Sequence, residues 1–159
     1  MSGRKPSAPR CAAIVGPYLS GKTTLLESLL FACGATQRKG SIKDRNTVGD
    51  ASPEARTRQM STEVSVASAE FLGEQWHFLD CPGSVEFAHD TYAALMVADV
   101  AIVVCEPEAS RALTLAPLLH FLDHHGIPHM VFINKMDHAN DRVRELLEAI
   151  QGVSERPLA

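Results

Sequence analysis

Short runs of apolar residues alternate along this chain with segments whose apolar residues recur every three or four positions. The runs are typical of buried strands, and the spaced segments are typical of helices that pack on one face. The predicted strands cover residues 11–15, 63–71, 75–80, 100–106 and 129–135. The predicted helices cover about 23–33, 85–98, 110–125 and 140–151.

Strands that alternate with helices predict an α/β fold with three layers, a mostly parallel sheet and right-handed crossovers. A turn at Gly73 joins two adjacent strands and predicts one antiparallel strand at the sheet edge. Ligands of such sheets bind at the carboxyl ends of the strands. The residues at those ends are Gly16, Asp80, Glu106 and Asn134. We therefore expect them along one rim of the sheet.

Two segments lack this apolar patterning. Residues 1–10 are polar, basic and contain prolines, so they predict a flexible leader ahead of a domain that covers 11–159. Residues 35–62 contain Gly40, Gly49 and many charges. A connection of that length is unusual in a compact domain unless it is functional or mobile.

Composition narrows the class of protein. The chain has 159 residues, of which 45% are hydrophobic and 21% charged, as in a single globular domain. Its net charge of −4 argues against direct sequence-specific binding of nucleic acid through a basic surface. No apolar run reaches the length of a membrane span, and residues 1–10 lack a signal core, so we expect a cytoplasmic protein without membrane association. The cysteines stand singly and predict small buried side chains rather than a metal site.

Residues 16–23, GPYLSGKT, match the phosphate-loop pattern G-x-x-x-x-G-K-[ST]. Between a strand and a helix, such a loop directs backbone N–H groups and a helix N-terminus at phosphates. Lys22 is expected to bridge the β- and γ-phosphates, and the Thr23 hydroxyl to coordinate Mg²⁺. A chance glycine-rich turn is the alternative, and the flanking elements argue against it. The predicted phosphate-binding residues are Gly16, Pro17, Tyr18, Leu19, Ser20, Gly21, Lys22, Thr23 and Thr24.

Residues 80–83, DCPG, follow a predicted strand. Asp80 is expected to hold Mg²⁺, and the Gly83 amide to sense the γ-phosphate. In isolation, Asp80 could equally cap the next helix. Its place after a phosphate loop favours the metal.

Residues 134–137, NKMD, have the chemistry to recognise guanine. The Asp137 carboxylate can accept hydrogen bonds from guanine N1–H and the 2-amino group, a pair that adenine does not offer. Lys135 is expected to lie along the base, and Asn134 to tie this loop to the phosphate loop. The pattern therefore predicts selectivity for GTP over ATP.

These motifs resemble the GTPase domain of translational GTPases, the elongation factor G family in particular, and within it the divergent elongation factor G-like branch. The resemblance extends from Arg10 to about Pro157. It implies the G-domain form of the P-loop NTPase fold, GTP/GDP and Mg²⁺ as ligands, and the ribosome as a partner; we also expect a monomer. Segment 50–63 resembles the family's first switch, with Ser61 as the Mg²⁺ ligand or Thr62 if the register differs by one.

Departures from the family pattern concern catalysis. Ser84 stands where the family has a histidine that orients the attacking water, and Leu19 stands where it has an aspartate. Pro17 and Gln59 also differ from the residues that the family has at these positions. We expect Lys22, Gly83 and Ser84 to form a weak catalytic set, because phosphoryl transfer depends on positioning and electrostatics.

Two rival functions remain open at this stage. One is a hydrolysis-deficient, GTP-dependent binding module, which Ser84 and Leu19 favour. The other is a P-loop kinase or ATPase of small-molecule metabolism, which NKMD and the long loop disfavour. His120 and His124 have the spacing of a metal pair on a helix, but a solvated face is the preferred interpretation. Another strand is expected after Ala159, so we expect an incomplete domain with an uncovered apolar edge and marginal stability.

Overall fold

The computed structural model describes residues 8, 10–42, 44, 46–49, 61–139 and 143–154. Within this part of the chain, a five-stranded sheet has the order β2-β3-β1-β4-β5. All neighbouring strands run parallel except β2, which is antiparallel to β3 at one edge. The strands are β1 Arg10–Val15, β2 Ser65–Phe71, β3 Glu74–Asp80, β4 Val100–Cys105 and β5 His129–Ile133. The predicted α/β fold with one antiparallel edge strand is confirmed.

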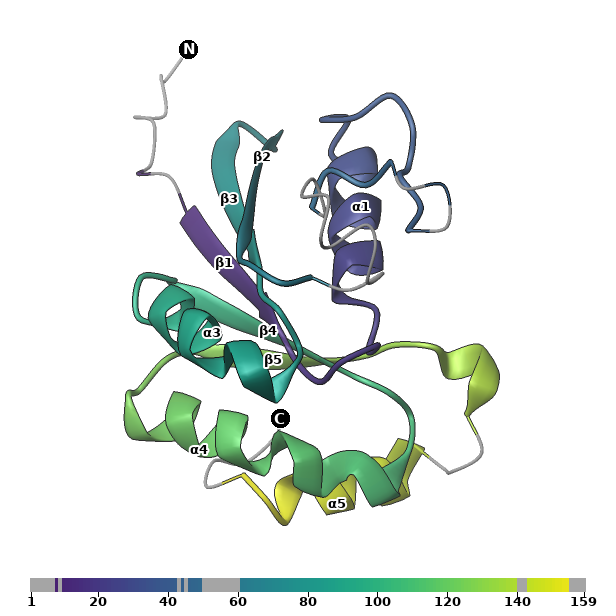
Figure 1. Ribbon diagram of the computed structural model, residues 1–159, viewed down its shortest axis with the longest axis vertical. Coiled ribbons are helices and arrows are strands. Elements are labelled where there is room, and N and C mark those ends of the chain that lie inside the picture. Colours follow the sequence, from purple (N-terminus) through teal and green to yellow (C-terminus); the bar gives the residue numbers. More distant parts are fainter. Residues whose placement is uncertain are drawn as a thin grey trace.

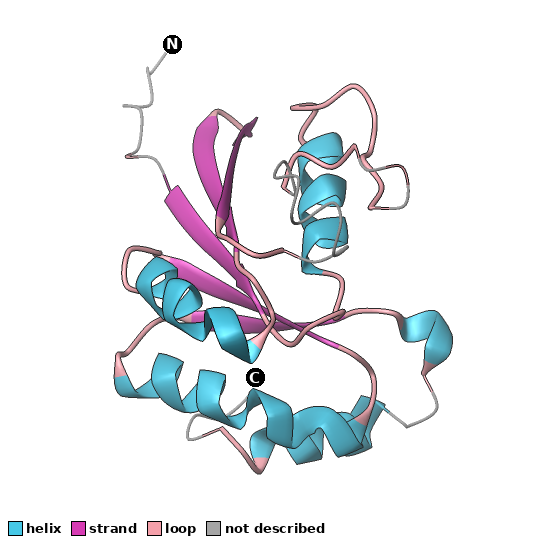
Figure 2. Ribbon diagram, in the orientation of Figure 1, coloured by secondary structure: helices cyan, strands magenta, loops and turns pink. Residues whose placement is uncertain are grey.

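Helices cover both faces of this sheet. Helix α1 lies on one face, and α3, α4 and α5 lie on the other (Figure 1, Figure 2). The helices are α1 Lys22–Ala32, α3 Ala88–Leu95, α4 Ala116–His124 and α5 Val143–Gln151. Short 3-10 helices are η1 Val85–Phe87, η2 Ala109–Leu115 and η3 Met136–His138. The arrangement has the three layers that the sequence predicted.

Strand β1 is the centre of the core because it has a strand on each side and helices on each face. Its apolar side chains alternate between the two faces of the sheet, as the period of a strand requires. Ala13 and Val15 pack into the cluster beneath α3, α4 and α5, whereas Ala12 and Ile14 pack into the cluster beneath α1. Burial on both faces explains why this strand is an unbroken apolar run.

Two helices differ in extent from their predictions. The segment predicted as helix 85–98 begins with η1 and its α-helical part ends at Leu95. The segment predicted as helix 110–125 begins with η2, and the α-helix α4 starts only at Ala116. Pro117 explains this start, because proline lacks an N–H and is tolerated in the first turn of a helix but not in its interior.

The prediction of a fully buried strand over 129–135 is wrong in two respects. Strand β5 ends at Ile133, and the side chains of Met130 and Phe132 are 56% and 37% exposed. The cause is its place at the edge of the described sheet, where β4 is its one neighbouring strand and α1 contacts mainly β1 and β3. Strand β5 therefore exposes apolar side chains at this edge of the sheet.

Several predictions concern residues outside the described part of the chain. These are most of the leader, the segment 50–60 with Gln59, the start of the last predicted helix, and residues 155–159. Strand β1 includes Arg10, which was predicted as the end of the leader. Among the described residues of 35–62, none belongs to a helix or a strand. No described helix is long and apolar enough to cross a membrane.

The cysteines behave largely as the sequence predicted. Cys81 and Cys105 are buried, Cys11 and Cys33 are partly buried, and all are free thiols. Burial, with a smaller contribution from Asp80, raises the pKa of the Cys81 thiol to about 12. Burial and the neighbouring Glu106 raise the pKa of Cys105 to about 11. Both thiols are therefore neutral at physiological pH. The described residues contain no group of three His, Cys, Asp or Glu that could hold a metal.

Candidate functional site

The phosphate loop connects β1 to α1, and its shape depends on two glycines. Gly16 has a φ of 141°, and a Cβ there would lie 2.1 Å from the carbonyl oxygen of Val104. Gly21 has a φ of 93°, and a Cβ there would lie 2.3 Å from Nδ2 of Asn134. A side chain at either position would require a strained backbone and displace a neighbouring strand end. The loop can therefore lie directly against the ends of β4 and β5.

Lys22, the first residue of α1, folds back over this loop. Its Nζ donates to the carbonyl oxygens of Gly16 and Pro17, at 3.1 and 2.9 Å. Gly83 lies against the same ammonium group, since a Cβ on Gly83 would be 2.3 Å from Lys22 Nζ. The structure thus brings together the cation of the phosphate loop and the glycine that follows β3.

Oxygen atoms gather beside Lys22. Thr23 Oγ1 donates to Asp80 Oδ2 at 2.7 Å, and it lies 3.4 Å from Ser61 Oγ. The observed register places Ser61 beside Thr23. Hydroxyl and carboxylate oxygens are the ligands that Mg²⁺ prefers. The donor set therefore fits a magnesium ion and does not resemble a site for a soft metal.

The NKMD segment contacts the phosphate loop through two side chains. Asn134 Nδ2 donates to the carbonyl oxygen of Ser20 at 2.9 Å, and Lys135 Nζ donates to that of Leu19 at 2.7 Å. The backbone N–H of Asn134 also donates to the carbonyl oxygen of Cys105, at the end of β4, at 2.8 Å. The ends of β4 and β5 and the phosphate loop therefore form one connected unit.

A cavity of about 250 Å³ lies between these elements. It brings together residues from the phosphate loop, the start of α1, the long loop, the segment after β3 and the NKMD segment. The lining residues are Tyr18, Leu19, Gly21, Lys22, Thr23, Thr24, Ile42, Ser61, Gly83 and Lys135. All but Ile42 were expected from the motifs. Ile42 was missed because it is a single apolar residue in a loop without periodicity.

Seven expected residues do not line this cavity: Gly16, Pro17, Ser20, Asp80, Ser84, Asn134 and Asp137. Two of them, Ser84 and Asp137, bear on catalysis and on base recognition. Ser84 precedes η1 as its N-terminal cap residue, without a side-chain hydrogen bond to that helix. Asp137 is exposed in η3, two residues beyond Lys135. His89, the next histidine along the chain after Ser84, is exposed on α3. The described structure therefore brings no imidazole to the cavity in place of Ser84.

Sequence reasoning also missed Glu27, a buried carboxylate on α1. Its Oε2 accepts a hydrogen bond from the backbone N–H of Gly40 at 3.0 Å, and its Oε1 accepts one from that of Val48. Gly49 then passes close to the Thr23–Asp80 pair, where a Cβ would lie 3.1 Å from Asp80 Oδ2. The sequence could have pointed to Glu27, because it is a charged residue on the apolar face of a predicted helix, next to Leu26 and Leu30.

Residues 8–156 match the profile of the elongation factor Tu GTP-binding domain family. The chain belongs to this family. An elongation factor G-like protein from Synechocystis sp. is 60% identical over 149 residues, which make up 94% of this chain and 22% of that protein. Elongation factor G 2 from Streptomyces coelicolor is 32% identical, over 86% of this chain and 20% of that protein.

A solved structure from Thermus thermophilus has a TM-score of 0.78 at 35% identity, and the match covers 90% of this chain and 22% of that one. The interpretation of the motifs as a G domain of the translational GTPases is confirmed. The chain spans about a fifth of the length of these relatives.

Proposed function

We propose that this chain binds GTP and GDP together with Mg²⁺, hydrolyses GTP slowly, and acts as the nucleotide-dependent switch of a ribosome-binding factor. The supporting observation is the cavity where the phosphate loop, the oxygen cluster and Lys135 meet. Membership of a GTP-binding family and the similarity to elongation factors support the same proposal. The proposed setting is the cytoplasm, with the G domain as a monomer and the ribosome contacted through other parts of a longer protein.

Polyphosphate would lie against the phosphate loop. Lys22 Nζ bonds to the loop carbonyls of Gly16 and Pro17, and in the complex it would turn its charge toward the β- and γ-phosphates. The N-terminus of α1 adds a favourable dipole for anions. Gly83, which lies next to Lys22 Nζ, would donate its amide to the γ-phosphate and so distinguish GTP from GDP.

Mg²⁺ would be held by Thr23, Ser61 and Asp80, with Asp80 acting directly or through water. When bound, the ion would neutralise part of the phosphate charge. Ser61 belongs to the segment that resembles the first switch, so its hydroxyl would connect the state of the nucleotide to the order of that segment.

Guanine would be bound at the NKMD segment. Lys135, already held against the phosphate loop, would lie along the base, while Asp137 would accept hydrogen bonds from N1–H and the 2-amino group. Asp137 is exposed in η3, two residues beyond Lys135. The proposed selectivity is for GTP and GDP over ATP.

A hydrolysis-deficient binding module is the second candidate function. The observation in its favour is Ser84, which has no imidazole and does not line the cavity. Without a group that orients water, hydrolysis would depend on Lys22, Gly83 and the metal alone. We favour slow hydrolysis because those electrostatic groups are present and typically supply a large share of the rate.

Ligand binding is tested by thermal-shift titration of the 159-residue chain with GTP, GDP and ATP in Mg²⁺. Either guanine nucleotide at a hundredfold excess over its Kd should stabilise the fold by about 2.7 kcal/mol, and ATP should not. The Lys22→Ala variant should lose most of this response. Stronger stabilisation by ATP would instead revive the kinase or ATPase hypothesis.

Hydrolysis is tested separately, by single-turnover measurements on the complete protein with and without ribosomes. Ribosome-stimulated release of phosphate would support the proposed switch and rule out the hydrolysis-deficient module. Tight GTP binding with no release of phosphate under either condition would favour that module.

A further inference from the structure

Lys135 is held in place by contacts within the protein itself. Its backbone adopts a left-handed conformation with a φ of 55°, which is uncommon for a residue with a side chain. Its Nζ donates to two acceptors from different elements, the carbonyl of Leu19 at 2.7 Å and Glu106 Oε1 at 2.5 Å. Main chain and side chain are thus both constrained at the residue that would lie along the base.

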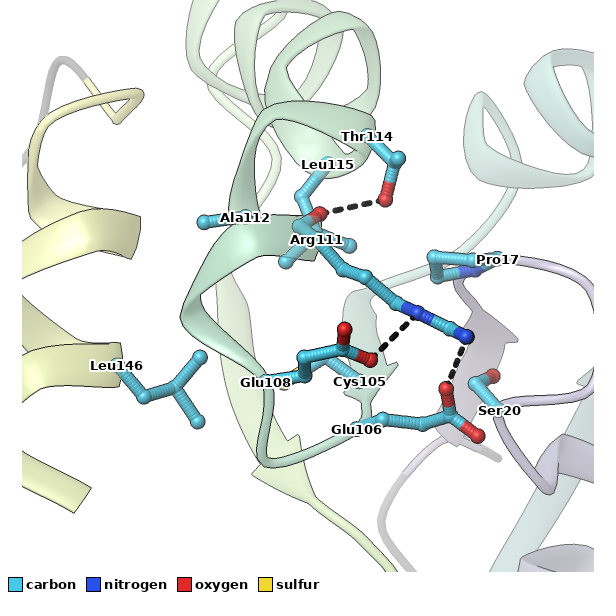
Figure 3. Close-up of a pocket in the computed structure, with 10 residues that line it drawn as sticks. All are labelled: Pro17, Ser20, Cys105, Glu106, Glu108, Arg111, Ala112, Thr114, Leu115 and Leu146. Carbon is cyan, nitrogen blue, oxygen red and sulfur yellow. Dashed lines mark hydrogen bonds and ion pairs between the residues drawn. The ribbon is translucent and has the colours of Figure 1, made fainter. Parts of the chain in front are cut away.

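Glu106, the residue after β4, holds two cations at once. One carboxylate oxygen pairs with Lys135, and the other pairs with Arg111 from η2. Arg111 also pairs with Glu108, at 2.7 Å (Figure 3). Because both oxygens of Glu106 are engaged, its carboxylate has a fixed orientation toward Lys135.

This ion pair is partly shielded from water, although the side chain of Lys135 is 38% exposed. The side chain of Glu106 is only 16% exposed, and exposed pairs contribute little because water screens them. Figure 3 shows Arg111 and Glu106 close to Pro17 and Ser20 of the phosphate loop. These residues line a small cavity of about 20 Å³. The network therefore lies at the contact between the phosphate loop and the end of β4.

We propose that Glu106 is a positioning residue for the guanine base, acting through Lys135, with Arg111 fixing its second oxygen. A free lysine side chain loses about 2 kcal/mol of rotamer entropy when it is held in one position. Glu106 holds Lys135 in place in the free protein, so less of this entropy remains to be lost on binding. The proposal rests on the proposed binding of guanine nucleotides.

The test is the affinity of the 159-residue chain for fluorescently labelled GDP, by equilibrium titration and stopped-flow dissociation. Glu106→Ala should weaken binding about tenfold, mainly through faster dissociation, as expected for loss of a charge-assisted hydrogen bond. Glu74→Ala is the matched control. The Glu74–Arg10 pair has side-chain exposures of 17% and 49%, against 16% and 54% for Glu106–Arg111, and lies at the opposite end of the sheet. The control should stay within twofold of the wild type.

A double-mutant cycle separates positioning from a general structural effect. If Glu106 acts through Lys135, the variant with both residues changed to alanine should bind GDP no more weakly than Lys135→Ala alone. Additive losses would overturn the proposal, as would equal losses in Glu106→Ala and the Glu74→Ala control. Arg111→Ala, which should weaken binding about threefold, keeps the proposal testable if Glu106→Ala fails to fold.

The nucleotide itself provides a second readout. Lys135 would contact the plane of the base rather than its 2-amino group, so Glu106→Ala should leave the ratio of GDP to inosine diphosphate affinity unchanged. A changed ratio would contradict the proposed route through Lys135. Failure of the wild-type chain to bind either guanine nucleotide would instead overturn the proposed function and, with it, this inference.

Discussion

Single residues at this site act through very close approaches. Lys22 Nζ lies where a side chain on Gly83 would have to be, so the ammonium group can lie directly against the segment after β3. Thr23 and Asp80 are likewise joined by a 2.7 Å hydrogen bond. Distances of this kind leave no room for an extra methyl group, and they explain why small changes should have specific effects.

Adding a methyl group at Gly83 should disturb phosphate recognition. A Cβ there would lie 2.3 Å from Lys22 Nζ and 2.8 Å from the carbonyl oxygen of Pro17. We expect Gly83→Ala to weaken GTP binding about tenfold, corresponding to about 1.4 kcal/mol, and to affect GDP less. Parallel titrations with both nucleotides measure this. Gly152→Ala, whose Cβ would be 3.4 Å from its nearest neighbour, is the control and should bind normally.

An imidazole at position 84 should accelerate hydrolysis. Ser84 precedes η1, immediately after the glycine that contacts Lys22. A histidine there is longer and can orient a water molecule, a role worth at least tenfold in rate in most enzymes. We expect Ser84→His to raise the single-turnover rate about tenfold or more, with GTP affinity within twofold of the wild type. Ser84→Asn, which lacks an imidazole, serves as the comparison; equal rates in both variants would argue against this role.

At the scale of elements, helix α1 organises the loop that follows it. One carboxylate, that of Glu27, accepts backbone hydrogen bonds from both Gly40 and Val48. The side chain of Ser65, at the start of β2, donates to the carbonyl of Gly49. The loop is thus attached to α1 through Gly40 and Val48, and to β2 through Gly49. Gly49 also lies close to the Thr23–Asp80 pair.

Removing Glu27 should release this loop. Glu27 is 1% exposed, so Glu27→Ala would leave the buried N–H of Gly40 without its acceptor. Loss of such a partner lowers the free energy of unfolding by roughly 1–3 kcal/mol. Urea unfolding measures that loss, and hydrogen exchange should show faster exchange at Gly40 and Val48. Ser28→Ala, on the same helix, is the control and should change stability by less than about 0.5 kcal/mol. Unchanged exchange in Glu27→Ala would contradict the assigned role.

At the scale of the whole molecule, two apolar clusters on opposite faces of the sheet stabilise the fold. The larger lies beneath α3, α4 and α5, and includes the neutral thiols of Cys81 and Cys105. The smaller lies beneath α1. The two edge strands are less covered, with Val66 and Phe71 exposed on β2 and Met130 and Phe132 exposed on β5. Stability of the molecule is therefore concentrated around β1 and β4.

Alkaline pH should destabilise the fold through these thiols. The folded-state pKa of Cys81 is raised from 9.0 to about 12, and that of Cys105 from 9.0 to about 11. Above pH 9 the unfolded chain loses thiol protons that the folded chain keeps, so stability falls as pH rises through these values. Between its unfolded and folded pKa, each thiol lowers the free energy of unfolding by up to about 1.4 kcal/mol per pH unit.

Because lysines and tyrosines titrate in the same range, the comparison is between wild type and Cys81→Ala. Urea unfolding from pH 8 to 11 should show a shallower decline for the variant, although its stability at pH 8 is lower. An identical slope in the two proteins would mean that Cys81 does not keep its proton in the folded state.

The sequence by itself determined the fold class and most of the residues around the cavity. Periodicity marked the strands and helices, and the motifs GPYLSGKT, DCPG and NKMD each combine residue types that one chemistry requires. These signals are local, because the loop after a strand and the helix that follows it are specified by adjacent residues. The alternation of elements then placed Asp80 and Asn134 at the same rim.

Only the tertiary structure decided contacts between distant segments. The burial of Glu27, the pairing of Glu106 with both Lys135 and Arg111, the position of Ile42 and the exposure of β5 follow no local pattern. Which side chains meet depends on how strands pair and helices cross, and an ion pair or a buried carboxylate is specified only when those segments come together. A local residue, Pro117, explains where α4 begins once the structure is known, whereas the partners of Glu106 depend on the assembled sheet.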